Sequence, residues 1–123
     1  MDHIGIPICD SARTKAFYEP LLVPLGWTCS GWRPGIFAAF KKAGAPALYF
    51  TVAQHVAQTH LAFKAPTPLQ VANFHRDALE AGGTDNGSPG PRPDYGPTYY
   101  AAFVLDPDGH NVEVVVGGVS TGP

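Results

Sequence analysis

Three side chains in this 123-residue sequence have types that suit a divalent metal ion: the imidazoles of His3 and His60 and the carboxylate of Glu113. Glu113 is the most unusual, because it stands among valines in the stretch "DPDGHNVEVVV". Burying an ionised carboxylate costs on the order of several kcal/mol unless a cation, a metal or hydrogen-bond donors compensate it. We therefore expect a compensating group opposite Glu113.

Two imidazoles and one carboxylate around one cavity form the 2-His-1-carboxylate arrangement, which holds a divalent metal and leaves coordination positions open. The three residues lie far apart in the sequence, so their types also fit a simpler interpretation: capping or surface histidines and a glutamate on an edge strand. The elements that carry these residues decide between the two.

An internal repeat relates the two histidines. The segments "HIGIPICDSARTKAFYEPLLVPLG" and "HLAFKAPTPLQVANFHRDALEAGG" align without a gap at an offset of 57 residues, the separation between His3 and His60. The repeat predicts two modules, about residues 1–56 and 57–123, within a single domain that spans 1–123.

Each module is predicted to contain a strand, a helix and three further strands. The first helix can begin at a cap on Asp10 or Ser11, and the second at Thr67 with Pro68 as its first residue. The predicted strands cover 3–8, 27–29, 36–41 and 47–52 in the first module, and a strand around 61–63 followed by 84–86, 99–105 and 111–116 in the second. One such module leaves a sheet face uncovered, and two copies can cover each other.

The alternation of side chains along a strand places both histidines opposite the apolar faces. His3 then shares its face with Gly5, and His60 shares its face with Ala62. Small neighbours of this kind suit the lining of a cavity better than a core packed against a helix. Glu113, on the last strand, points to the face opposite that of Val112 and Val114.

Several short motifs resemble the vicinal oxygen chelate superfamily. They are the module starts "DHIGI" and "THLAF", the motifs "FH" and "AGG" in the second helix region, and the ending "DPDGHNVEVV". That superfamily includes glyoxalase I, bleomycin resistance proteins and extradiol dioxygenases, and the resemblance covers nearly the whole chain. The stretch "DNGSPGPRPDYGPTYYAAFVLDPDG" further resembles its small lyase-like members. It implies an α+β fold in which two βαβββ modules form a cupped, incomplete barrel. It also implies metal ligands on the first and last strands of each module, and frequent assembly as homodimers.

Carried over to this chain, the resemblance implies that His3, His60 and Glu113 are three of four metal ligands, with Glu113 also catalytic, and that the metal is Fe, Mn, Zn or Ni. The fourth ligand, Glu or Gln in glyoxalase I, falls near Tyr49. A glyoxalase needs a basic carboxylate at this fourth position to move a proton, and a tyrosine does not supply one. The remaining three ligands resemble the metal ligands of extradiol dioxygenases. We interpret the chain as a metal-dependent lyase- or dioxygenase-type enzyme acting on a small oxygenated substrate. The alternative, favoured by Tyr49, is a metal-free binding or resistance protein of the bleomycin-resistance type.

The segment 85–98 is dense in Gly and Pro and is expected to be a loop that cannot continue the strand ladder. It is either a lid over a bound ligand or a rigid connector. Arg92, Tyr95, Tyr99 and Tyr100 flank it and can form a mouth for a planar or anionic small molecule. In the simpler interpretation, Tyr99 and Tyr100 alternate, one packed under the second helix and one facing solvent.

Two other histidines are expected to be structural. His75 is predicted to be a half-exposed residue of the second helix. His110 lies in "DPDGHN", where Asp106, Asp108 and Gly109 suit turn chemistry.

Composition limits the remaining possibilities. The net charge of −2, a pI near 6.2 and the absence of a basic run argue against nucleic acid. No apolar stretch approaches the roughly 18 residues that span a bilayer, and the N-terminus does not resemble a signal peptide. We expect a cytoplasmic protein with reduced Cys9 and Cys29, no membrane contact and a small-molecule ligand.

Overall fold

The computed structural model describes residues 1–117, which form two compact units, one of Met1–Thr59 and one that begins at His60. The first unit contains β1 (His3–Ile8), α1 (Ser11–Leu22), the short 3-10 helix η1 (Val23–Leu25), β2 (Thr28–Arg33), β3 (Phe37–Lys41) and β4 (Ala47–Val52). The second contains β5 (His60–Lys64), α2 (Pro68–Glu80), β6 (Thr84–Pro91), the 3-10 helix η2 (Pro93–Tyr95), β7 (Tyr100–Leu105) and β8 (Asn111–Val116). The predicted α+β fold with two βαβββ modules is confirmed.

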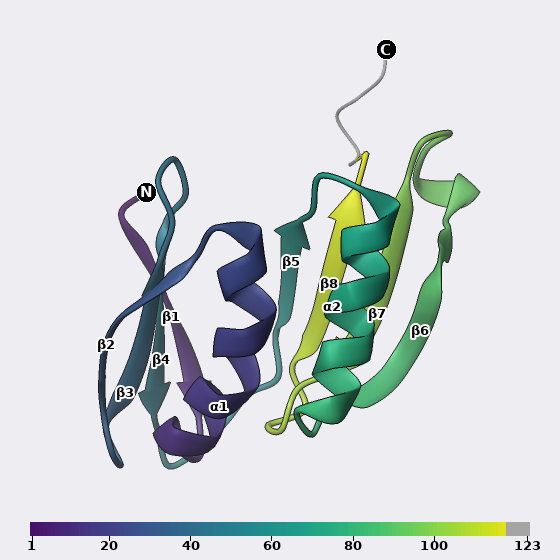
Figure 1. The fold of residues 1–123 in the computed structure, drawn as a ribbon. Helices are drawn as coiled ribbons and strands as arrows, with labels where there is room; N and C mark the ends of the chain where they lie inside the picture. The colour runs from purple at the N-terminus through teal and green to yellow at the C-terminus, as the bar shows by residue number, and fades with distance from the viewer. Residues whose placement is uncertain (118–123) are drawn as a thin grey trace. The chain divides into compact units, whose positions relative to one another are not determined.

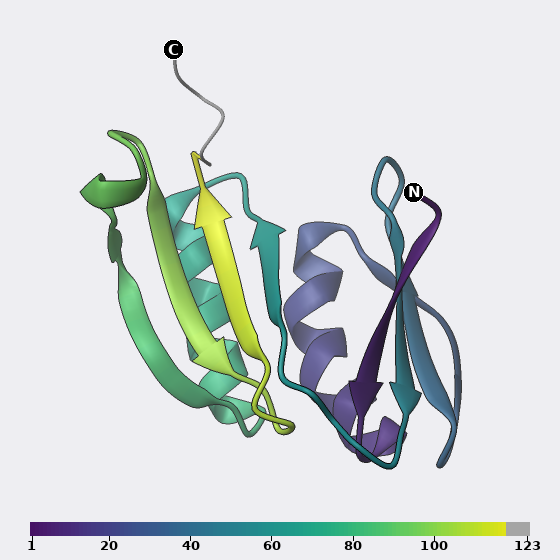
Figure 2. The ribbon, with the colours of Figure 1, turned by 180° about the vertical axis from the view of Figure 1, so that it is seen from behind.

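The two units have the same topology. Their four-stranded sheets have the orders β1-β4-β3-β2 and β5-β8-β7-β6, in which the first and last strands pair in parallel and the others are antiparallel. In each unit the single helix covers one face of its own sheet, as Figures 1 and 2 show from opposite sides. Within residues 1–117, neither helix has the length and apolar character needed to cross a membrane.

Both helices begin where the sequence predicts. The carboxylate of Asp10 accepts hydrogen bonds from the backbone N–H groups of Ala12 and Arg13, at 3.0 and 3.2 Å. The hydroxyl of Thr67 accepts one from the N–H of Gln70 at 3.2 Å. Each cap satisfies donors that the first turn of a helix leaves free.

Each unit has its own apolar core between helix and sheet. In the first unit the Tyr18 ring of α1 stacks on Phe50 of β4, with centroids 4.5 Å apart. In the second, Phe74 of α2 lies against Phe63 of β5, with centroids 6.3 Å apart. Phe63 therefore marks the side of the second sheet that faces α2.

The segment 85–98 departs from the prediction, because its first half is not a loop. β6 extends from Thr84 to Pro91 and pairs with β7 in antiparallel fashion, with register shifts on either side of Gly87. The expectation that so many Gly and Pro residues cannot continue the ladder is wrong. β6 is the edge strand, where a proline without an N–H is tolerated, and Gly87 adopts a φ of +152° at an irregularity.

Candidate metal and ligand site

The second sheet has a face that points away from α2, here called the far face. Because Phe63 contacts α2, the alternation of β5 puts its neighbours His60 and Ala62 on the far face. Glu113 pairs with Ala62 on one side and with Phe103 on the other, so all four side chains share this face.

Glu113 has the compensating groups that its position requires. The side chain is buried, with 5 % of its surface exposed. Its Oε1 lies 2.9 Å from Nε2 of His60, and its Oε2 accepts a short hydrogen bond from the Tyr99 hydroxyl. Both carboxylate oxygens therefore face hydrogen-bonding partners on the far face.

Tyr99 is buried on the far face, beside Ala101 and Val115. Burial, and next the hydrogen bond to Glu113, raise the pKa of its phenol to about 12. The hydroxyl therefore stays protonated and can donate a hydrogen bond throughout the physiological pH range. Tyr100, one residue later, pairs with Val116 and lies on the opposite side of the sheet. Of the two tyrosines, the buried one belongs to the far face and does not pack under α2.

His60 connects this buried pair to solvent. Its side chain is 48 % exposed, whereas that of Glu113 is 6 % exposed. The imidazole stacks on Phe103, with centroids 6.4 Å apart and planes inclined by 29°. The half-exposed ring is thus held in place by an aromatic neighbour, with Nε2 directed at Glu113.

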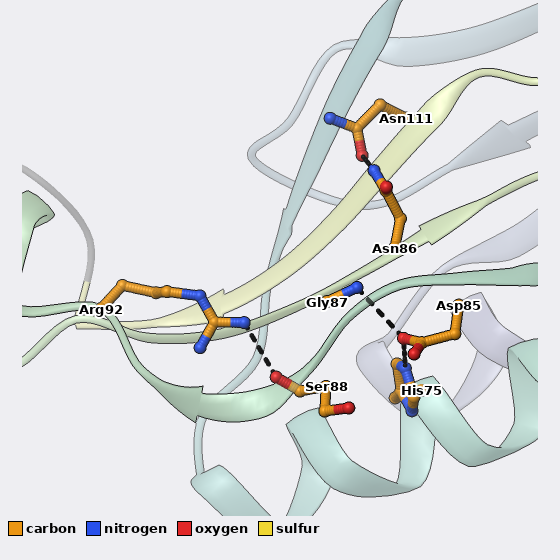
Figure 3. Close-up of polar contacts among 7 residues, drawn as sticks. All are labelled: His75, Asp85, Asn86, Gly87, Ser88, Arg92 and Asn111. Carbon is orange, nitrogen blue, oxygen red and sulfur yellow. Dashed lines mark hydrogen bonds and ion pairs between the residues drawn. The ribbon is translucent and has the colours of Figure 1, made fainter.

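Arg92 follows β6 and turns back on that strand. Its guanidinium donates to the carbonyl oxygens of Ser88 at 2.8 Å, Gly90 at 3.0 Å and Pro91 at 3.2 Å, and Figure 3 shows the first of these. It also lies 5.5 Å from the centre of the Phe103 ring. These donors brace the irregular part of β6, a role that the sequence analysis missed because it depends on carbonyls exposed by register shifts.

Tyr95, the other residue predicted to line a ligand mouth, is exposed. Its ring meets that of Tyr99 edge-on, with centroids 5.2 Å apart. An exposed ring, that of Tyr95, therefore lies next to the buried ring of Tyr99, whose hydroxyl contacts Glu113.

His3 and Tyr49 belong to the first unit. Gly5 pairs with Tyr49 there, just as Ala62 pairs with Glu113 in the second unit, so Tyr49 occupies the equivalent position. The His3 ring lies 5.2 Å from that of Tyr49, and its Nδ1 is 2.7 Å from a carboxylate oxygen of Asp2. A contact at Nδ1 leaves Nε2 as the nitrogen for a ligand. His3 as a third metal ligand remains a prediction from the sequence.

The pair in the second unit fits a divalent metal. Imidazole nitrogens and carboxylate oxygens bind such ions at about 2.0–2.2 Å, so two neighbouring ligands of one ion lie roughly 3 Å apart. Nε2 of His60 and Oε1 of Glu113 are separated by 2.9 Å. A neutral imidazole beside a carboxylate is also the donor set that first-row transition metals accept.

The family model of the Glyoxalase/Bleomycin resistance protein/Dioxygenase superfamily matches residues 1–114. The chain belongs to this superfamily. Among solved structures, a glyoxalase/bleomycin resistance protein from Albidiferax ferrireducens T118 is 26 % identical over 94 % of this chain and 96 % of its own, with a TM-score of 0.78. No curated protein matches the sequence.

Two further members of known structure share the fold at lower identity. A glyoxalase/bleomycin resistance protein/dioxygenase family enzyme from Burkholderia phytofirmans PsJN is 20 % identical, covering 94 % of this chain and 98 % of its own, with a TM-score of 0.74. Lactoylglutathione lyase from Agrobacterium tumefaciens is 21 % identical, covering 95 % and 92 %, with a TM-score of 0.70. At these identities the likeness establishes the fold of the superfamily and nothing about the reaction.

A second group with metal-binding residue types lies in the turn between β7 and β8. One ligand atom from each of Asp106, Asp108 and His110 lies within 4.8 Å of the others. The Asp106 carboxylate accepts hydrogen bonds from the N–H groups of Asp108 and His110, both at 2.9 Å, and the N–H of Gly109 donates to the Asp106 carbonyl. These bonds are the turn chemistry that the sequence predicts.

His75 differs from its prediction, because it is buried rather than half-exposed. Its Nε2 lies 2.9 Å from Oδ1 of Asp85, which also accepts a hydrogen bond from the N–H of Gly87 at 3.0 Å (Figure 3). The contact joins α2 to β6. The contact could not be predicted from local patterns, because it depends on the register that pairs Asp85 with Val104 and on how α2 lies over β6.

Proposed function

We propose that this superfamily member binds a divalent metal through His60 and Glu113 and acts on a small oxygenated substrate as a lyase- or dioxygenase-type enzyme. The observation that carries the proposal is the 2.9 Å pair of a half-exposed imidazole and a buried carboxylate. A metal bound there would supply Lewis-acid polarisation of neighbouring substrate oxygens. Iron, manganese, zinc and nickel all suit this donor set.

The protein's own contribution is to prepare the two ligands. Stacking on Phe103 holds the His60 ring, and burial limits water around Glu113. Exposed Tyr95 offers an aromatic surface to a ligand. Tyr49 and Arg92 remain candidate ligand contacts from the sequence, although Arg92 is already bonded to β6.

Metal content and metal titration test the proposal. Protein purified without chelator is analysed for bound elements, stripped, and titrated calorimetrically with Fe²⁺, Mn²⁺, Zn²⁺ and Ni²⁺. His60→Ala is expected to lose binding, and His3→Ala tests the predicted third ligand in the same assay. His55→Ala, which changes an exposed histidine outside the strands, is the matched control. A wild-type protein that takes up none of these ions would overturn metal dependence.

A metal-free small-molecule binding or resistance function is the second candidate. It is favoured by the two partners that already occupy the oxygens of Glu113, and by a tyrosine at the equivalent position of the first unit. Ligand binding that survives complete chelation would support it.

Assembly and location are also proposals. The superfamily resemblance favours a homodimer, which light scattering at micromolar protein would test. The composition favours a cytoplasmic location.

A further inference from the structure

The two oxygens of Glu113 lie in different surroundings. Oε1 faces the half-exposed ring of His60, at 2.9 Å from Nε2. Oε2 faces the hydroxyl of Tyr99, which is itself 8 % exposed. One oxygen of the carboxylate therefore meets a half-exposed ring, and the other is committed to a buried donor.

Several contacts fix the position of that donor. The Tyr99 ring packs with Ala101 and Val115 and meets the ring of Tyr95 edge-on. The backbone carbonyl of Tyr99 accepts a hydrogen bond from the N–H of Arg92 at 2.8 Å. A phenol held on both its ring and its backbone cannot easily swing away from Glu113.

A carboxylate that has one oxygen already hydrogen-bonded binds some metal ions more readily than others. Ca²⁺ takes about six to eight oxygen ligands and often binds both oxygens of one carboxylate. Zn²⁺ takes about four ligands, accepts imidazole nitrogen and needs only one carboxylate oxygen. Committing Oε2 to a phenol therefore penalises the first kind of ion more than the second.

We propose that Tyr99 is a positioning residue that holds Oε2 of Glu113 and presents Oε1 alone, so that the site takes transition-metal ions through a single carboxylate oxygen and discriminates against Ca²⁺. The inference rests on the proposed metal site at His60 and Glu113. It adds the residue that sets how Glu113 binds and which class of ion it accepts.

Tyr99→Phe tests this inference, because the variant keeps the ring and its packing and removes only the hydroxyl. Outer partners of metal ligands typically contribute about 10–100-fold to metal affinity. We expect Zn²⁺ affinity, measured calorimetrically, to fall by about that factor, while Ca²⁺ affinity is unchanged or rises. Tyr100→Phe, one residue along on the opposite side of the sheet, is the control and should leave both affinities unchanged.

The possible outcomes separate the two proposals. A wild-type protein that binds no Zn²⁺ overturns the metal site and this inference together. Wild-type binding with unchanged affinities in Tyr99→Phe, or with equal losses for both ions, overturns the role of Tyr99 alone.

A second measurement does not depend on Tyr99→Phe. Infrared difference spectra of Zn²⁺-loaded wild-type protein report the splitting of the carboxylate stretches, with Glu113→Gln identifying the band. The expected splitting is the wide one of single-oxygen binding, and a narrow two-oxygen splitting would overturn the inference.

Discussion

Tyr49 and Glu113 occupy equivalent positions in the two units, each paired with the residue two places after the histidine that opens the first strand. Glu113 is buried and bonded to its neighbours, whereas Tyr49 is 41 % exposed. One repeated scaffold thus carries a carboxylate site in one copy and an aromatic surface in the other.

That equivalence gives a gain-of-function prediction. If Tyr49 stands at the fourth ligand position that the superfamily resemblance implies, Tyr49→Glu supplies the missing carboxylate. We expect Zn²⁺ to bind about tenfold tighter, which corresponds to roughly 1.4 kcal/mol. Tyr49→Phe is the control for loss of the phenol alone. An affinity equal in Tyr49→Glu and Tyr49→Phe would contradict the assignment of this position.

Glu113→Gln separates ligation from folding. Glutamine keeps the volume and can still bond to both Tyr99 and His60, so the thermal midpoint should change by only a few degrees. Metal affinity should fall by more than about tenfold, because the anionic ligand is lost. Circular dichroism melts and calorimetric titration of the same sample give both numbers. Equal metal affinity with reduced stability would assign Glu113 a structural role only.

Both α-helices, their caps and the strands other than β2 and β6 follow from local patterns that the sequence displays directly. Asp10 and Thr67 act within three residues, and alternation along β5 is enough to put His60 opposite the core. The Tyr99–Glu113 and His75–Asp85 contacts could not be predicted in the same way. They depend on strand register and on how α2 lies over its sheet, which composition does not reveal.

The His75–Asp85 contact predicts a defined pH dependence of stability. Hydrogen bonds from His75, and next from the N–H of Gly87, lower the pKa of Asp85 below its ordinary value of 3.8. A group whose pKa is depressed by folding stabilises the fold above its ordinary pKa, and that contribution is lost as the pH falls through the lower, folded value. Asp85→Asn should therefore lower the thermal midpoint at pH 7.

The same variant should differ progressively less from wild type as the pH falls below 3.8, because the lowered pKa of Asp85 makes its stabilising contribution decline in that direction. Asp94→Asn, in η2, is the control for removing an acidic charge. A difference between wild type and Asp85→Asn that stays constant from pH 7 to pH 2 would contradict the assignment.

Gly117 links backbone geometry to the site. It adopts a φ of +97°, and a Cβ there would overlap the carbonyl oxygen of Thr98, the residue before Tyr99. Gly117→Ala should destabilise the fold by on the order of 1–3 kcal/mol from backbone strain alone, with the overlap adding to this. Gly82→Ala is the matched control, because its φ is +105° and nothing lies within 4 Å of the added carbon.

The overlap should also displace Tyr99 and weaken metal binding in Gly117→Ala beyond any change in Gly82→Ala. Urea unfolding and Zn²⁺ titration measure the two effects. Equal behaviour of the two variants would show that the Thr98 carbonyl yields without cost.

Substitution of Arg92 tests whether this residue belongs to a lid over a ligand or to a brace for β6. Its bonds to the carbonyls of Ser88 and Gly90 favour a brace, and added methyl groups at Gly87 or Gly90 would come within 3.3 Å of its guanidinium. Arg92→Ala should therefore speed amide hydrogen exchange along β6 and lower stability, because the carbonyls of Ser88 and Gly90 lose a charged donor. Tyr95→Ala, which removes an exposed ring, should leave exchange in β6 unchanged and weaken only ligand binding.

Unchanged exchange in Arg92→Ala together with weaker ligand binding would instead assign Arg92 to the ligand. Unchanged ligand affinity and unchanged stability in the double variant Arg92→Ala/Tyr95→Ala would show that the segment is a connector alone.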